Sequence, residues 1–120
     1  MQLPPRERSL RILAGALAAA AGVGHVVLGA VNLIPGEPTA GPLFLAIGAG
    51  YFAFAALVLL RKTFFDPLAM FYALALILAY AASRDGQPVE PIGLLIKGVE
   101  AALLLTLLGI LRLQRISGKE

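Results

Sequence analysis

The segment from Pro91 to Arg112, PIGLLIKGVEAALLLTLLGILR, constrains the fold of this chain most, because it is apolar over the length of a membrane span. A helix of about 20 apolar residues crosses the hydrocarbon core of a bilayer. The segment nevertheless contains Lys97 and Glu100. Each charged residue at this depth costs roughly 2.5–3.5 kcal/mol on insertion scales, so it usually has a partner or a function. Three positions apart on a helix, the two side chains share a face and are expected to pair.

Three further apolar runs precede this segment. The chain of 120 residues is 59% hydrophobic and 14% charged, which lies outside the range of soluble globular domains. We therefore expect an all-α fold, a four-transmembrane-helix bundle with up-down topology. Residues 1–120 would form a single integral membrane domain, with helices at about 9–34, 42–62, 67–84 and 91–114. A cleaved signal peptide is the alternative for the first run, but that run is longer than a typical signal-peptide core.

The Lys and Arg residues that flank the apolar runs predict the orientation. Cytoplasmic flanks of membrane proteins carry an excess of these residues. The two termini and the connection between the second and third runs contain eight of them, Arg6, Arg8, Arg11, Arg61, Lys62, Arg112, Arg115 and Lys119, whereas the other two connections contain only Arg84. We therefore expect both termini in the cytoplasm and a multi-pass protein of the cell membrane.

Polar residues from three helices are expected to meet at one depth in the membrane. With a rise of about 1.5 Å per residue, His25, Tyr51 and Glu100 each lie roughly 13–14 Å from the outer boundary, and Lys97 lies about one turn above them. His25, Tyr51, Lys97 and Glu100 are therefore the candidate ligand or proton site. Three further polar residues are expected around it: Asn32, Tyr80 and Ser83.

Each of these residues also has a purely structural interpretation. Lys97 and Glu100 could neutralise one another as part of helix packing. His25 could hydrogen-bond between helices, although a histidine beside a carboxylate is also suited to carry a proton. Asn32 is expected to cap or join helices, and Tyr72 and Tyr80 are typical core or interface aromatics.

Several chemistries have no support in the sequence. The chain has no cysteine and one histidine, which excludes thiolate ligands and a haem held by two histidines of the same chain. One His and one Glu are too few for a closed structural zinc site. No phosphate-binding loop or serine-nucleophile motif occurs. We expect no cofactor and no metal, assign no catalytic residue, and do not expect an enzyme.

Two sequence segments resemble a known class of protein. GVGHVVLG at residues 22–29, together with PIGLLIKGVE at residues 91–100, is similar to small four-helix membrane proteins of archaea and bacteria whose function is uncharacterised. The resemblance implies a four-helix membrane architecture and no particular activity.

The sequence thus suggests two functions. The first is the binding or transport of a small ligand or proton at the intramembrane site. The alternative is an accessory or scaffolding subunit of a larger membrane complex, which Gly- and Ala-rich helix faces would favour. The expected partners are the lipid bilayer and either further copies of the chain or such a complex, and no nucleic acid is expected.

Overall fold

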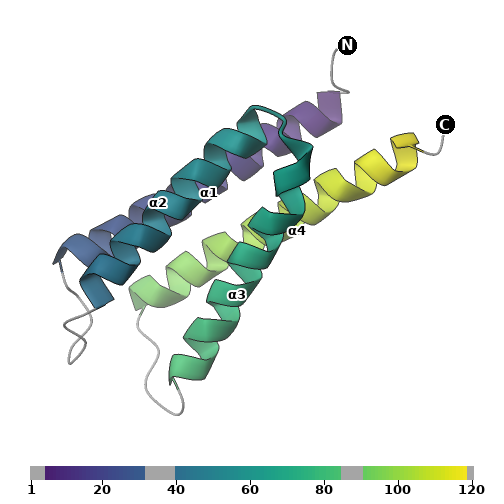
Figure 1. The fold of residues 1–120 in the computed structure, drawn as a ribbon. Helices are drawn as coiled ribbons and strands as arrows, with labels where there is room; N and C mark the ends of the chain where they lie inside the picture. Colours follow the sequence, from purple (N-terminus) through teal and green to yellow (C-terminus); the bar gives the residue numbers. More distant parts are fainter. Residues whose placement is uncertain (1–4, 32–39, 85–90, 119–120) are drawn as a thin grey trace.

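The computed structural model describes residues 5–31, 40–84 and 91–118, and every regular element among them is helical (Figure 1). There are four α-helices, α1 (Pro5–Val31), α2 (Ala40–Leu59), α3 (Asp66–Arg84) and α4 (Pro91–Gly118), and a short 3-10 helix, η1 (Thr63–Phe65). The predicted all-α class is confirmed. Four segments are long and apolar enough to cross a membrane: Pro5–Ala30, Pro42–Leu59, Thr63–Ala82 and Gly93–Arg115.

Helix α1 begins earlier in the sequence, and helix α4 ends later, than predicted. Helix α1 begins at Pro5 rather than at about residue 9. Proline is tolerated there because its missing N–H costs nothing in a first turn, where that group has no helical partner. Helix α4 begins at Pro91, as predicted, and continues to Gly118 rather than ending at about residue 114.

Helix α2 ends at Leu59, before the predicted end at about residue 62, because the chain reverses in a Schellman turn. The N–H of Arg61 donates to the Val58 carbonyl at 3.1 Å, and the N–H of Lys62 donates to the Leu57 carbonyl at 3.0 Å. Arg61 has a φ of 62°, the left-handed conformation that this turn requires. The tight reversal leads directly into η1 and α3.

Asp66 directly precedes Pro67, a sequence pattern that predicts a helix N-cap, but Asp66 does not cap α3. A capping residue has non-helical dihedral angles. Asp66 has φ −59° and ψ −48°, which are helical values. Its carboxylate is used in a different interaction, described below.

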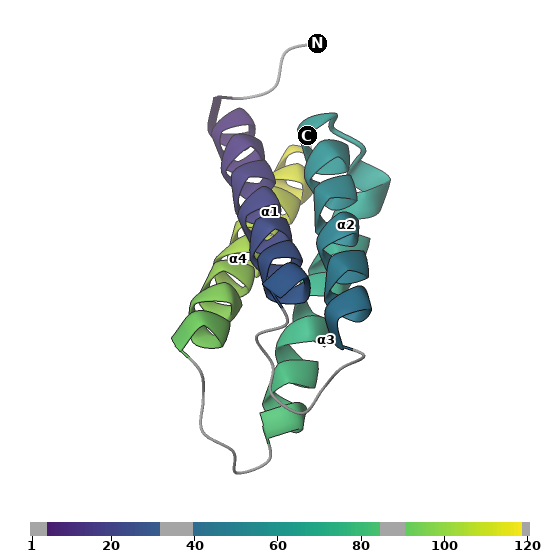
Figure 2. The same cartoon turned by 90° about the vertical axis from the view of Figure 1, so that its left-hand side faces the viewer.

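The helices alternate in direction along one long bundle (Figures 1 and 2). Helix α1 packs along α2 and α4, and α3 packs along α4. Helices α2 and α3 meet at η1 and then diverge (Figure 1). The start of α1, the α2–α3 connection and the end of α4 lie together at what we call the basic end; α1 ends and α4 begins at the opposite end, the loop end.

Small side chains bring the helices close together around the core. Leu103, Leu107 and Ile110 of α4 are buried together with six alanines, Ala14, Ala18, Ala21, Ala55, Ala69 and Ala73. Helices α1 and α2 approach most closely at Gly22 and Gly48, where a Cβ added to Gly48 would lie 2.8 Å from the Gly22 carbonyl oxygen. This contact positions α2 next to the polar residues of α1.

Candidate functional site

The Glu100 carboxylate is the centre of the polar site. The Glu100 residue is 0% exposed, and Tyr51 of α2 is 1% exposed. The Tyr51 hydroxyl donates a hydrogen bond to Oε2 of Glu100. The Nζ atom of Lys97 lies 2.5 Å from Oε1 as an ion pair. Both carboxylate oxygens therefore have a polar partner, which compensates for their removal from water.

Lys97 connects this carboxylate to α3. Its Nζ donates to the Leu76 carbonyl at 3.3 Å and lies 5.4 Å from the centre of the Tyr80 ring. Tyr80 was predicted near the site, and the structure places it there. The Lys97 side chain is 15% exposed, whereas the Glu100 side chain is fully buried. Lys97 is thus the residue of the ion pair that is partly exposed at the surface.

His25 lies beside Tyr51 rather than in the ion pair. Its ring centre is 5.5 Å from that of Tyr51 and 5.7 Å from that of Phe44. Its Nδ1 lies 2.8 Å from the Ala21 carbonyl oxygen. Because a carbonyl can only accept, Nδ1 carries the hydrogen, and Nε2 is the basic nitrogen of the neutral ring. His25 therefore contacts the Tyr51 ring, and Tyr51 in turn donates its hydroxyl hydrogen to Glu100.

Aromatic side chains connect α2 and α3. The ring centre of Tyr72 lies 4.9 Å from that of Tyr51 in an edge-on arrangement and 5.2 Å from that of Phe54. The Tyr72 hydroxyl donates to the Ile47 carbonyl at 2.7 Å. Tyr72, predicted as a core or interface aromatic, holds α3 to α2 while Tyr51 is left to bind Glu100.

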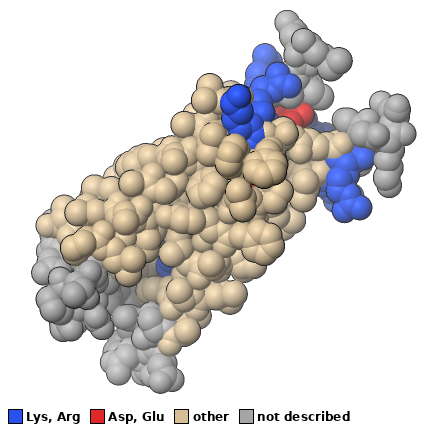
Figure 3. Space-filling view, viewed as in Figure 1, with Lys and Arg blue, Asp and Glu red and all other residues tan. Residues whose placement is uncertain are grey.

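The surface is hollowed near this site. Figure 3 shows a notch toward the loop end, with a small basic area inside it, while most of the surrounding surface carries neither acidic nor basic side chains. The partial exposure of Lys97 agrees with such a hollow. Water or a small polar molecule in the notch would meet a basic group rather than an acidic one.

Two of the predicted surrounding residues are outside what the structure describes. Asn32 lies in the undescribed segment 32–39. Ser83 belongs to α3, but its side chain is not among those described. Among the described residues of the predicted site, Tyr51 and Lys97 both bind the Glu100 carboxylate. The His25 ring packs beside the Tyr51 ring.

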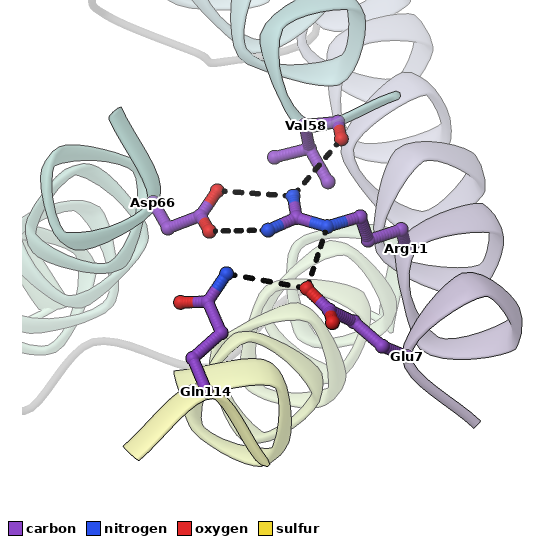
Figure 4. Close-up of polar contacts among 5 residues, drawn as sticks. All are labelled: Glu7, Arg11, Val58, Asp66 and Gln114. Carbon is purple, nitrogen blue, oxygen red and sulfur yellow. Dashed lines mark hydrogen bonds and ion pairs between the residues drawn. The ribbon is translucent and has the colours of Figure 1, made fainter. Parts of the chain in front are cut away.

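A second buried polar cluster, which sequence reasoning missed, lies at the basic end (Figure 4). Arg11 of α1 is its centre. Its Nη2 donates to Oδ2 of Asp66 at 3.0 Å, its Nη1 donates to the Val58 carbonyl at 3.1 Å, and its Nε donates to Oε1 of Glu7 at 3.3 Å. Gln114 of α4 donates to the same Glu7 oxygen at 3.2 Å. We call these five residues the Arg11 network, and it joins all four α-helices.

The sequence contained a partial signal for this network. Glu7 and Arg11 are four residues apart, which is the spacing of a helical ion pair. Glu7, however, precedes the predicted first helix at about 9–34, and Arg11 is one of the basic flanking residues that predict the orientation. Asp66, directly before Pro67, has the local pattern of a helix N-cap. Its pairing with Arg11 spans 55 residues of sequence, and no local pattern indicates so distant a contact.

Comparisons of the chain with protein-family models, curated proteins and solved structures find no match. Among the described residues, no group of three or more metal-ligating side chains is placed to hold a metal ion. The four long apolar helices have the pattern of a multi-pass membrane protein. The function must therefore be argued from the two buried polar clusters.

Proposed function

We propose that this chain is a multi-pass protein of the cell membrane that binds or moves a small polar ligand or a proton at the Tyr51–Lys97–Glu100 site. The observation that carries the proposal is a carboxylate buried completely within apolar helices, whose Lys97 partner remains part-exposed. Buried charges at this depth are expensive and commonly mark functional pathways. Glu100 would accept a proton or contact a cation, and Lys97 would supply the countercharge.

His25 and Tyr51 would assist this exchange. Tyr51 donates to Glu100, and the basic Nε2 of His25 provides a second proton acceptor near the Tyr51 ring. Tyr80, which lies next to the Lys97 ammonium, would border the ligand.

We further propose that the site is reached from the loop end, with both termini in the cytoplasm. Glu100 and Gln114 are separated along α4 by roughly 21 Å, at about 1.5 Å per residue. Leu103, Leu107 and Ile110 are buried between them, and the Arg11 network joins the helices beyond this layer. These features favour a hollow that is open on the loop side and closed toward the basic end.

Proton movement across liposomes tests this function directly. The purified protein would be reconstituted with a pH-sensitive dye inside, and a potassium gradient with valinomycin would impose a voltage. We expect a proton flux that Glu100→Gln abolishes and that Tyr72→Phe retains, because the Tyr72 hydroxyl binds a backbone carbonyl rather than Glu100.

Mass spectrometry of the protein extracted from native membranes would test for a bound small molecule. The proposal predicts that such a molecule is present in the native protein and depleted by Glu100→Gln. If the folded native protein shows neither proton flux nor a bound molecule, the proposed function is wrong.

Access from the loop end can be measured because the chain has no native cysteine. A Cβ at Gly98 would have no neighbour within 4 Å. A cysteine replacing Gly98 would therefore face lipid, and it serves as the control for labelling with thiol reagents. A cysteine replacing Lys97 should react with a membrane-impermeant reagent added on the loop side. Reaction from the side of the basic end would contradict the proposed access.

The accessory-subunit function is supported by a different observation. Helix α3 has less of its span buried than the other three helices and exposes Leu68, Phe71, Leu74 and Leu78. Such a face suits contact with another membrane protein as well as with lipid. Purification in mild detergent distinguishes the two functions, because an accessory subunit should retain a partner in fixed stoichiometry, with no effect of Glu100→Gln on its recovery.

A further inference from the structure

The basic end has an excess of exposed positive charge. Six described residues at this end have exposed cationic side chains: Arg6, Arg8, Arg61, Lys62, Arg112 and Arg115. Glu7 and Asp66 are the described acidic residues there, and both are buried against Arg11. The Arg11 network therefore buries most of the surface of these two acids, whereas the six cations remain exposed.

The cations come from three separate parts of the chain that meet in space. Figure 3 shows basic side chains gathered at this end of the molecule, with a small acidic area beside them, whereas most of the adjoining body on this face carries neither acidic nor basic side chains. In a membrane-spanning bundle, this position is the boundary between the apolar core and water. A partner that contacts all three parts must therefore be anionic and located at the membrane surface.

The α2–α3 connection combines these cations with exposed apolar side chains. Leu60 is 66% exposed and Phe64 is 77% exposed, and they lie on either side of Arg61 and Lys62 in the sequence. A segment of this kind can insert its apolar groups at the boundary of the acyl chains while its cations remain at the level of the headgroups. The connection thus presents apolar side chains that can contact acyl chains and cations that can contact headgroups.

We propose that the basic end binds the headgroups of anionic phospholipids, with the Arg61–Lys62–Phe64 connection as its main contact. Anionic lipids attract basic residues next to a membrane span, and the attraction falls off within a Debye length. The lipid phosphates lie at the depth of these side chains, so contact needs no rearrangement of the helices. This proposal depends on the membrane location but not on ligand binding at Glu100.

Lipid titration of the full-length protein in neutral detergent tests the proposal. Phosphatidylglycerol and phosphatidylcholine with the same acyl chains would be added separately, and the dissociation constant would be obtained by native mass spectrometry. We expect tighter binding of phosphatidylglycerol, and weaker binding when salt is raised from about 0.05 M to about 0.5 M. Lys62→Gln should weaken phosphatidylglycerol binding about fivefold.

Arg84→Gln is the matched control, because it removes one positive charge at the last residue of α3, at the loop end. It should leave phosphatidylglycerol binding unchanged. Circular dichroism would show that each variant is folded. Equal binding of the two lipids, equal weakening by Lys62→Gln and Arg84→Gln, or full competition by equimolar inorganic phosphate would each overturn the proposal.

Discussion

At the scale of single residues, the buried charges of this protein are stabilised by specific partners rather than by water. Glu100 accepts from Tyr51 and pairs with Lys97, and Arg11 pairs with Asp66. In an apolar environment the cost of removing a charge from water is recovered only if its partner is present. The loss of one partner should therefore destabilise the fold more than the loss of both.

Substitutions of Lys97 and Glu100 test this coupling. We expect Lys97→Met or Glu100→Gln alone to lower the free energy of unfolding by roughly 3–5 kcal/mol, because each leaves a buried polar group without its partner. The double substitution should cost less than either single change. Denaturation in detergent micelles would measure all three variants, and small, additive effects would show that the two side chains are solvated independently.

Arg11 and Arg8 both belong to α1, but Arg11 is buried whereas Arg8 is exposed, so we expect their substitution to change the stability of the fold by different amounts. We expect Arg11→Gln to cost roughly 3–5 kcal/mol, since it leaves the Asp66 carboxylate buried without its cation. Arg8→Gln, one turn nearer the start of α1 and exposed, should change stability by less than about 0.5 kcal/mol. Thermal unfolding of the two variants is a direct comparison, and equal effects would contradict a structural role for the Arg11 network.

At the scale of the helices, glycine allows α1 and α2 to approach closely enough to place His25 beside Tyr51. The two backbones face one another at Gly22 and Gly48. Gly98 of α4 has the opposite environment, because a Cβ there would have no neighbour within 4 Å. Identical substitutions at these positions should therefore have opposite effects.

We expect Gly48→Ala to destabilise the protein by roughly 1–3 kcal/mol, because the new methyl group would press on the Gly22 backbone. Gly98→Ala should instead stabilise α4 by about 0.5–1 kcal/mol, since alanine has the higher helix propensity and meets no obstacle. Unfolding midpoints of both variants would test the packing of α1 against α2. Tolerance of alanine at Gly48 would mean that the two helices lie further apart.

At the scale of the whole molecule, the two buried polar clusters lie in opposite halves of the bundle. The Arg11 network joins all four helices at the basic end, whereas α2 and α3 diverge toward the loop end. Glu100 lies on the loop side of the buried apolar layer formed by Leu103, Leu107 and Ile110. The same network buries Glu7 and Asp66 at the basic end, where six described cations remain exposed.

The sequence by itself determined the properties that depend on local composition and length. The number of long apolar helices and the start of α4 at Pro91 follow from hydrophobicity and proline chemistry, which act within a few residues. The pairing of Lys97 with Glu100 was also predictable, because three residues of helix place both side chains on one face. The regular helical rise also predicted that Tyr51 and Glu100 lie at one depth.

Only the tertiary structure decided which partner each remaining polar side chain has. His25 donates to its own helix and contacts Tyr51, because the rotation of α1 about its axis depends on packing at Gly22 and Gly48. Asp66 binds Arg11 rather than capping α3, because the Schellman turn and η1 carry α3 back to the start of α1. Local sequence sets the length and depth of a helix, whereas its rotation and its neighbours follow from close packing across the whole bundle.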